Sequence, residues 1–307
     1  MVISIMMSTY NGEKFLREQL DSILAQNLPD GFSLKVIVRD DGSSDATLSI
    51  LNEYCEKYSS VISYYTGDNL KPQRSFWHLL KNCPPSDFYA FSDQDDFWYP
   101  DKLARAIAAL QAEPNQNIPL LYTTNVMVAD AELNPVAPMY SGKKHTDFAH
   151  MLIYNLSNGC TQVFNNCARD EFIKYDMDSN LVIMHDRLAD LLTAMFGKLI
   201  YGEEPSMLYR QHGNNAVGEQ SLGRFKSFIK RVKRFCGSSN SIRSDRSRMF
   251  LDLYGDRLTE EQKRLLWAVG YYKTDKKARK TLIKDKAFSK GKKDDFFFHL
   301  AIRFKKI

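Results

Sequence analysis

The sequence predicts an α/β fold in which helices flank a mostly parallel, doubly wound central sheet. Short apolar runs alternate with amphipathic helical patterns through the first half of the chain, and this alternation is typical of parallel sheets. Three polar clusters each follow one of the apolar runs directly, at Ser8–Gly12, Asp40–Ser43 and Asp93–Asp96. The 307 residues are 44% hydrophobic, which suits one large globular domain, or one domain with an appendage.

The individual elements follow from the apolar spacing. Apolar runs predict strands at Val2–Met7, Leu34–Val38, Val61–Tyr65, Asp87–Phe91 and Leu120–Thr124. Helical spacing predicts helices through Leu16–Leu24, from about Ser44-Asp45, at Phe76–Leu80, and from Pro100 as a first helical residue. Ligands bind beyond the carboxyl ends of the strands in such sheets. We therefore expect the three polar clusters to meet at one ligand-binding edge.

The stretch Asp93-Gln94-Asp95-Asp96 is the most informative of the three clusters. It places three carboxyl groups within four residues, directly after the apolar run Phe88–Phe91. Adjacent carboxylates repel each other, whereas a hard divalent cation bound to a diphosphate is satisfied by oxygen ligands. A solvated acidic turn is the alternative, and the other two polar clusters at the same edge favour the cation. The sequence thus indicates a site for Mg²⁺ or Mn²⁺.

Charge divides the chain into two regions. Residues 219–307 hold 25 Lys and Arg against 10 Asp and Glu, which leaves 17 against 27 for residues 1–218. An acidic body with a basic C-terminal region is typical of a catalytic domain joined to a segment that binds anions. We therefore predict a catalytic domain over 1–218 and a basic, mainly helical region over 219–307.

Several classes of protein are disfavoured by what the sequence lacks. Neither GxGxxG nor GxxxxGK[ST] occurs, so the phosphate loops of dinucleotide oxidoreductases and P-loop enzymes are missing. No apolar run approaches the ~20 residues of a membrane-spanning helix. The opening apolar run is too short for a secretory signal, and the five cysteines form no CxxC pair. Reduced thiols in a cytoplasmic protein are the expectation.

Four segments together give the chain a resemblance to glycosyltransferase family 2. They are Ser4–Gly12 (SIMMSTYNG), Val38–Asp45 (VRDDGSSD), Phe91–Trp98 (FSDQDDFW) and Met184-His185-Asp186. The resemblance spans residues 1 to about 218 and implies an inverting enzyme with a GT-A fold. The SDQDD-F-W form and the segment Tyr209–Asn215 (YRQHGNN) most resemble the bacterial rhamnosyltransferase branch, which builds surface polysaccharides such as capsule and O-antigen.

The resemblance implies roles for residues at the predicted edge. Those expected to bind the nucleotide sugar are Ser8, Thr9, Tyr10, Asn11, Asp40, Asp41, Arg74, Asp93, Asp96 and Arg210. Tyr10 can stack on a pyrimidine, and Asp41 can accept the N3–H that uracil and thymine share. These two residues therefore do not separate a UDP donor from a dTDP donor. Asp95 and Asp93 match the DxD motif and are expected to hold the metal, together with His212.

The resemblance also implies the catalytic and acceptor residues. Inversion requires one carboxylate to deprotonate the acceptor hydroxyl, and Asp186 is the candidate base. His185 either orients Asp186, contacts the acceptor or is a buried core residue. Gly159 and Cys160 match a small-residue segment beside the acceptor pocket.

The expected partners are a dTDP- or UDP-linked sugar donor and an acceptor that is a glycan or a polyprenyl-diphosphate-linked glycan. Aromatic and basic residues mix in two segments, Phe225–Arg234 and Phe296–Ile307, and this mixture favours peripheral contact with the anionic inner face of the cell membrane. Packing of these aromatics onto the catalytic domain is the alternative. Nucleic acid is not expected, because no recognition motif accompanies the charge. Two other functions remain open: a UDP-hexose or UDP-N-acetylhexosamine transferase, and a non-catalytic nucleotide-sugar or membrane-binding scaffold.

Overall fold

The structure is a computed structural model that describes residues 1–140, 144–212, 242–289 and 292–305. Its chain divides into two compact units. Unit 1 contains Met1–Lys144 and Leu156–Gly218, and unit 2 contains His145–Asn155 and Glu219–Ile307. The sequence analysis does not anticipate that the short segment His145–Asn155 belongs with the C-terminal residues.

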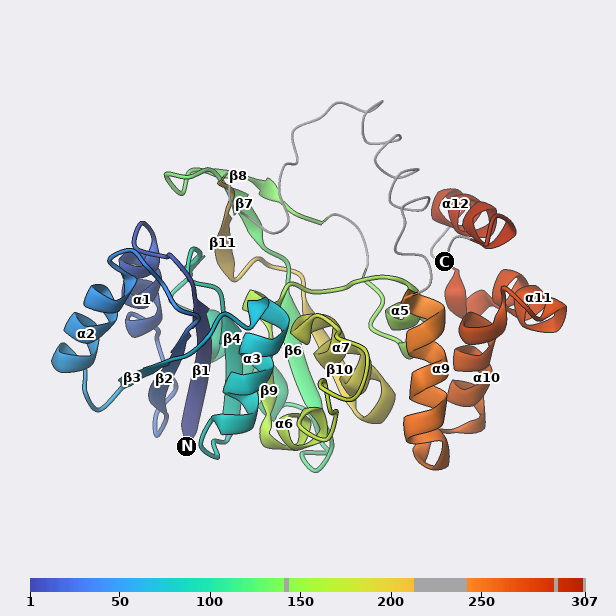
Figure 1. The fold of residues 1–307 in the computed structure, drawn as a ribbon, viewed down its shortest axis with the longest axis horizontal. Coiled ribbons are helices and arrows are strands. Elements are labelled where there is room, and N and C mark those ends of the chain that lie inside the picture. Colours follow the sequence, from blue (N-terminus) through green and yellow to red (C-terminus); the bar gives the residue numbers. More distant parts are fainter. Residues whose placement is uncertain (141–143, 213–241, 290–291, 306–307) are drawn as a thin grey trace. The chain divides into compact units, whose positions relative to one another are not determined.

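Unit 1 is built on a seven-stranded sheet with the order β10-β6-β9-β4-β1-β2-β3 (Figure 1). The strands are β1 (Val2–Thr9), β2 (Ser33–Asp40), β3 (Ile62–Thr66), β4 (Phe88–Ser92), β6 (Leu120–Thr124), β9 (Val163–Asn165) and β10 (Lys198–Gly202). All neighbours in this sheet pair in parallel except β9, which is antiparallel to both β4 and β6. The predicted α/β class with a mostly parallel sheet is therefore confirmed.

The antiparallel strand β9 has a local cause. It follows the 3₁₀ turn η1 (Gly159–Thr161), which lies against β4, and it leads directly into helix α6 (Asn166–Phe172). A parallel connection would need a crossover of a dozen or more residues to carry the chain back to the other edge. The connection into β9 is long enough for such a crossover, since it includes α5 (Phe148–Ile153), but β9 is entered through η1 beside the end of β4 and runs in the opposite direction.

Helices cover the sheet on both sides. In Figure 1, α3 (Lys71–Asn82), α6 and α7 (His185–Phe196) lie in front of the strands. The remaining helices of unit 1 are α1 (Leu16–Leu24), α2 (Thr47–Lys57) and α4 (Lys102–Gln111). Helix α3 contains the predicted helical stretch Phe76–Leu80 and begins five residues earlier, which places Arg74 in its first turn. The prediction of Pro100 as a first helical residue was wrong, because α4 begins at Lys102 with Asp101 as its N-cap.

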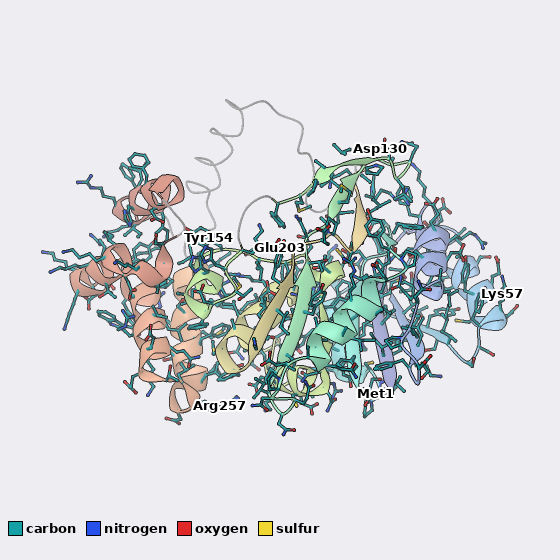
Figure 2. The ribbon with its side chains drawn as sticks, turned by 180° about the vertical axis from the view of Figure 1, so that it is seen from behind. Met1, Lys57, Asp130, Tyr154, Glu203 and Arg257 are labelled. Carbon is teal, nitrogen blue, oxygen red and sulfur yellow. The ribbon has the colours of Figure 1, made fainter. Side chains whose placement is uncertain are left out.

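A second sheet of four short strands was not predicted. Its order is β5 (Phe97–Trp98), β11 (Met207–Arg210), β7 (Met127–Ala129) and β8 (Pro135–Pro138). Figure 2 shows Asp130, between β7 and β8, at the opposite end of the unit from Met1. Because β1 begins at Val2 and runs away from Met1, the small sheet stands at the carboxyl edge of the large one.

Unit 2 is helical in its described residues. Its helices are α5 (Phe148–Ile153), α9 (Ile242–Tyr254), α10 (Glu260–Tyr271), α11 (Lys276–Lys284) and α12 (Lys292–Arg303). Thr259 and Gln262 form a capping box that starts α10, satisfying two backbone N–H groups that a helix start leaves open. Within the described ranges of the whole chain, no helix has both the length and the apolar character needed to cross a bilayer.

The core of unit 1 predicts a stability difference. Phe164 of β9 is fully buried, with its ring centroid 5.1 Å from that of Phe91 and 5.2 Å from that of Phe172. We expect Phe164→Ala to lower the free energy of unfolding by about 3–5 kcal/mol, because it leaves a cavity among these rings. The control Val136→Ala, at a position that is 68% exposed, should change it by less than about 0.5 kcal/mol. Urea denaturation measures both, and equal values would contradict this description of the core.

Candidate functional site

The three polar clusters lie together at one edge of the sheet, as predicted. Strand β1 pairs with β2 so that Thr9 is opposite Asp40, and with β4 so that Met7 is opposite Ser92. The residues that follow these strands therefore leave the sheet side by side. A backbone hydrogen bond of 2.8 Å from Asp41 N to Thr9 O fixes the first two clusters together.

Asp40 shapes the turn that follows β2. Its carboxylate is fully buried and accepts hydrogen bonds from Thr9 Oγ1 at 2.9 Å and from the backbone N–H groups of Gly42 at 3.1 Å and Ser43 at 2.8 Å. The hydroxyl of Ser43 in turn accepts from the backbone N–H of Asn11 at 2.8 Å. These bonds give Asp40 and Thr9 a positioning role, in which they hold the turn in place for Tyr10 and Asn11.

Asp41 is held by a buried network. It forms an ion pair with Arg39, and its two oxygens accept hydrogen bonds from Ser75 Oγ at 2.8 Å and from Leu70 N at 3.0 Å. Ser75 also lies 2.7 Å from the Ser8 hydroxyl, so it connects α3 to β1 as well as to Asp41. Burial lowers the pKa of Arg39, and pairing with a carboxylate compensates a buried cation. The sequence analysis missed Ser75, since a serine within a helix carries no distinguishing signal.

Gln94 connects the acidic cluster to the first turn. Its side chain accepts from Tyr10 N at 2.9 Å and donates to Tyr10 O at 3.1 Å. A Cβ added at Gly12 would collide with this amide, so the glycine is required for the contact. The Tyr10 side chain itself remains 51% exposed, which leaves it accessible to a planar ligand. The sequence analysis assigned Gln94 no role, although it lies within the acidic motif.

The acidic residues crowd one another. Burial, followed by the charges of Asp95 and Asp186, raises the pKa of Asp93 to about 7. The Asp95 side chain is 21% exposed, and its Oδ2 is 2.8 Å from Nε2 of His212. The structure therefore brings Asp93, Asp95, Asp186 and His212 into one neighbourhood. The rest of the segment from Tyr209, residues 213–215, lies outside the described residues.

Asp96 points into the protein. It is 1% exposed, and burial raises its pKa well above the ordinary value. One oxygen accepts from Arg210 N at 3.3 Å, whereas Oδ2 has no hydrogen-bond partner in the described part of the chain. Ligand atoms of Asp93, Asp96 and Cys160 all lie within 4.8 Å of one another. Asp96 thus lies behind the exposed acids, which does not match the expected contact with the donor sugar.

Lys102 is a buried cation that the sequence analysis missed. It is 1% exposed, and its Nζ donates to Cys160 O at 2.9 Å and lies 4.6 Å from the Trp98 ring centroid. Burial lowers its pKa to about 8, while Asp96 and Cys160 act in the opposite direction. Lys102 therefore places a positive charge behind the acidic cluster. No sequence signal identifies it, because a lysine at the start of a helix is ordinarily solvated.

Arg210 and Cys160 differ from their expected roles, because both side chains are buried and engaged by protein groups. The Arg210 guanidinium donates to Glu18 at 2.5 Å, to Asp95 O at 2.8 Å and to Ala131 O, and it stacks 4.4 Å from the Phe15 ring centroid. This arrangement makes Arg210 a positioning residue for the backbone of Asp95. The Cys160 thiol is directed at the acidic residues rather than at an open pocket, and burial raises its pKa well above the ordinary value.

Asp186 stands in the first turn of α7, beside the acidic cluster. It accepts from the backbone N–H of Arg187 at 2.6 Å. Burial raises its pKa, and hydrogen bonds from Arg187 and Gly159 partly offset that effect. Its carboxylate lies close enough to Asp93 to raise the pKa of that acid.

A buried polar network lies one helical turn below Asp186. Asp190 is fully buried and accepts from Ser157 Oγ at 2.8 Å and from Gln162 Nε2 at 2.9 Å. Gln162 Nε2 also donates to the backbone oxygen of Asp186 at 2.9 Å. Burial raises the pKa of Asp190 to about 7, although both donors lower it. This network fixes the start of α7, and the sequence analysis did not identify it.

His185 is a core residue in this structure. Its ring stacks on Phe76 with centroids 4.0 Å apart and meets Phe91 edge-on at 4.8 Å. Neither ring nitrogen has a hydrogen-bond partner among the described residues. A Cβ added at Gly159 would collide with Nε2, so Gly159 makes room for this ring. Of the three roles considered for His185, the buried one describes its surroundings.

Arg74 is the predicted site residue that stands apart from this network. Its guanidinium pairs with Asp178, and the two side chains are 39% and 72% exposed. Exposed ion pairs of this kind contribute little to stability. Arg74 is therefore accessible at the start of α3 but is not fixed toward the acidic residues.

The acidic cluster fits a divalent cation. The carboxyl groups of Asp93, Asp95 and Asp186 lie close to one another, and burial and mutual repulsion raise the pKa of Asp93 to about 7. A bound cation relieves such repulsion, and carboxylate oxygens are the ligands that Mg²⁺ and Mn²⁺ prefer. His212 adds a nitrogen next to Asp95, which is compatible with Mn²⁺.

Comparison with known proteins gives consistent results. The sequence model described as Glycosyl transferase family 2 matches residues 4–164. The dTDP-rhamnosyl transferase RfbG of Shigella flexneri is 32% identical over 243 residues, which cover 74% of this chain and 78% of that protein.

Two solved structures are similar in fold. S. aureus TarS 1–349 in complex with UDP-GlcNAc superposes with a TM-score of 0.54 and 14% identity, covering 99% of this chain and 91% of that one. The mannosyltransferase PcManGT from Pyrobaculum calidifontis, in complex with GDP-Man and Mn²⁺, gives a TM-score of 0.52 and 15% identity over 99% of this chain and 84% of that one. At these identities the likeness concerns the fold alone.

The buried His185 predicts a dependence of stability on pH. Burial lowers its pKa from 6.5 to about 3. Between these values the unfolded chain binds a proton that the folded chain does not, so stability falls as the pH falls, by up to about 1.4 kcal/mol per pH unit. Between about pH 7 and about pH 5, we expect the free energy of unfolding to fall by about 2 kcal/mol more in the wild type than in His185→Leu, which has no imidazole to protonate. Urea denaturation at several pH values measures this difference.

The exposed His299 provides the control for this experiment. His299→Gln on α12 should follow the wild-type profile, because its ring is exposed. Parallel profiles for the wild type and His185→Leu would show that His185 is not the source of the pH dependence.

Proposed function

The chain belongs to glycosyl transferase family 2 and has the GT-A fold, and we propose that it transfers a sugar, with inversion, from a nucleotide donor to a hydroxyl group. The proposed donor is dTDP-L-rhamnose, and the proposed acceptor is a lipid-linked or growing cell-surface polysaccharide. The 32% identity with a dTDP-rhamnosyl transferase supports this donor. One observation carries the catalytic part: Asp186 lies close enough to Asp93 to raise its pKa.

The nucleotide is proposed to bind at the first two clusters. Tyr10 is exposed beside Gln94, where its ring can stack on a pyrimidine base. Asp41 is held by Ser75 and Leu70, and an anchored carboxylate can accept the N3–H of that base. Uracil presents the same edge, so a UDP-hexose or UDP-N-acetylhexosamine remains the second candidate donor.

The metal is proposed to bind at Asp95 and Asp93, with His212 beside them. Bound there, Mg²⁺ or Mn²⁺ would supply charge neutralisation for the departing nucleoside diphosphate. Arg210 holds the backbone of Asp95 through its Nε, and the buried Lys102 lies near enough to Asp96 for this acid to raise the lysine pKa. These two cations keep the acidic segment in place without occupying its exposed side.

Asp186 is proposed to deprotonate the acceptor hydroxyl as that oxygen attacks the sugar from the face opposite the diphosphate. The proton moves to the Asp186 carboxylate while the bond between the sugar and the diphosphate breaks. The backbone N–H groups of Arg187 and Gly159 hold this carboxylate, and the network at Asp190 fixes the helix turn below it. General-base assistance contributes roughly 10²–10⁴-fold to the rate.

Substitution of the proposed base gives the direct test. We expect Asp186→Asn to lower kcat for rhamnosyl transfer by about 10²–10⁴-fold and to leave dTDP binding unchanged, because the amide keeps the shape but cannot accept a proton. Asp95→Ala should instead abolish the dependence of donor binding on Mg²⁺ or Mn²⁺. Radiolabelled sugar transfer measures the first effect, and calorimetry with dTDP measures the second.

The control for these variants is Asp30→Asn, in an exposed turn outside the site. Equal turnover by the wild type, Asp186→Asn and Asp95→Ala would remove the catalytic assignment and leave the non-catalytic scaffold. A panel of nucleotide sugars separates the donors, since faster turnover of a UDP sugar than of dTDP-L-rhamnose would overturn only the rhamnosyl specificity.

Peripheral contact with an anionic membrane is proposed for unit 2. Phe296, Leu300 and Phe304 recur every four residues along α12 and the residue after it, and they are 63%, 38% and 65% exposed. Arg303 and Lys305 are exposed nearby. Aromatic residues beside cations favour anionic lipid surfaces, with roughly 1 kcal/mol for each well-placed cation. The other basic segment considered, Phe225–Arg234, lies outside the described residues.

Vesicle binding tests this surface. We expect the double variant Phe296→Ser/Phe304→Ser to reduce co-sedimentation with phosphatidylglycerol-containing vesicles by about tenfold or more, because two exposed rings no longer enter the lipid. Val136→Ser, which changes an exposed apolar residue of unit 1, is the control. Unchanged partitioning of the double variant, or of a chain without 219–307, would exclude the membrane contact.

A further inference from the structure

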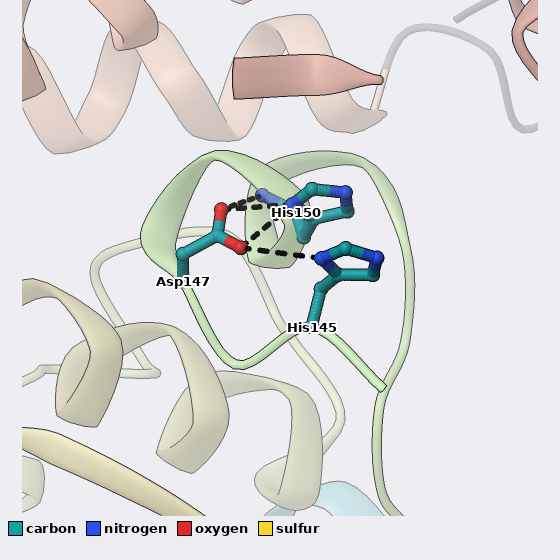
Figure 3. A group of neighbouring side chains, drawn as sticks. All are labelled: His145, Asp147 and His150. Atoms are coloured by element: carbon teal, nitrogen blue, oxygen red, sulfur yellow. Dashed lines mark hydrogen bonds and ion pairs between the residues drawn. The ribbon is translucent and has the colours of Figure 1, made fainter. Parts of the chain in front are cut away.

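A second group of candidate metal ligands lies in unit 2. One ligand atom from each of His145, Asp147 and His150 lies within 4.8 Å of the other two. The Nδ1 atoms of His145 and His150 are 3.9 Å and 2.8 Å from carboxylate oxygens of Asp147. Figure 3 shows the two imidazole rings lying one above the other, with the Asp147 carboxylate beside both. The ring centroids are 4.1 Å apart and the ring planes differ by 8°. No function assigned to this chain so far uses these residues.

The hydrogen bond of His150 fixes which nitrogen is available to a ligand. Its Nε2 lies 2.9 Å from the backbone oxygen of Ser289, which can only accept, so Nε2 carries the hydrogen. In the neutral ring, Nδ1 is then a bare lone pair, and it faces the Asp147 carboxylate at 2.8 Å. Two acceptors at this distance repel each other unless a cation lies between them. A ring N–H donated to a backbone carbonyl is also the usual support of a metal-ligating histidine.

The surroundings suit a bound ion rather than only an exposed pair. The His150 side chain is 6% exposed, and it is fixed by Ser289 on one side and by Asp147 on the other. The side chains of Asp147 and His145 are 52% and 34% exposed, so both are accessible from solvent. Two histidines and one carboxylate with an open fourth position form a common ligand set for zinc.

We propose that His145, Asp147 and His150 bind one divalent transition-metal ion of the zinc class. The ion would join His145 and Asp147, which precede α5, to His150 in the first turn of that helix. Because His150 also contacts Ser289, the site connects α5 to the end of the 3₁₀ turn η3 (Lys286–Phe288). The site therefore stabilises the segment His145–Asn155 within unit 2. It is distinct from the acidic cluster of unit 1 and does not depend on the proposed transferase activity.

The test uses the full chain, freed of metal by a chelator and titrated with Co²⁺ as a spectroscopic probe. We expect the wild type to develop the visible absorption of cobalt bound to nitrogen ligands, to lose it when Zn²⁺ is added, and to gain thermal stability with Zn²⁺. His145→Gln and Asp147→Asn should weaken zinc binding at least about 100-fold, since loss of an outer-shell partner alone costs 10–100-fold. Asp147→Asn keeps the N-cap acceptor of α5, so this variant is expected to fold.

Two controls complete the experiment. His299→Ala removes an exposed histidine of the same unit, and Asp95→Ala removes the proposed ligand of unit 1. Both should keep the cobalt spectrum and the zinc-dependent gain in thermal stability. The absence of a cobalt spectrum in the wild type would overturn the proposal. An unchanged spectrum in both His145→Gln and Asp147→Asn would also overturn it. Either result would mean that His150 and Asp147 form only an imidazolium–carboxylate pair.

Discussion

Repulsion among carboxyl groups at the carboxyl edge of the sheet is the constraint on which the rest of unit 1 depends. Burial and the charges of Asp95 and Asp186 act on Asp93 together, and they raise its pKa to about 7. Uncompensated burial of carboxylates is costly, and the fold meets this cost with positive charge placed behind the cluster. Lys102 lies near Asp96, and Arg210 binds Asp95 O and Glu18. The exposed side of the cluster is thereby left for a cation and its ligand.

Three supporting residues link the elements that carry the proposed site residues. Ser75 joins α3 to Ser8 and Asp41, and Gln94 joins the acidic turn to Tyr10. Gln162 connects Asp190 to the start of α7. Each of these groups makes at least two hydrogen bonds, so we expect the proposed site residues to need little reordering when a donor binds. Preorganisation of this kind favours the transition state, because charges need not move during the reaction.

The sequence predicted the parts of the fold that depend on local periodicity. Strand β6 matches Leu120–Thr124 at both ends, and the apolar face of α1 at Leu16, Leu20 and Ile23 is buried. It missed β9 and β5, since strands of three and two residues show no period. It assigned roles to the acidic cluster and to Asp186, because carboxylates directly after strands and at helix starts leave a pattern, and these roles stay predictions. It missed Lys102 and Asp190, whose burial results from tertiary packing alone.

The two ligand clusters differ in chemistry, so the ions proposed for them should bind independently. Carboxylates dominate in unit 1, and they favour a hard cation with phosphate oxygens as further ligands. Two imidazoles dominate in unit 2, and they favour zinc over magnesium by the order of nitrogen affinities. A chelator that takes zinc but leaves excess Mg²⁺ should therefore remove only the ion proposed for the second cluster. Under those conditions a loss of stability with retained sugar transfer would assign the imidazole cluster to folding, whereas loss of both would mean that unit 2 supports the active site.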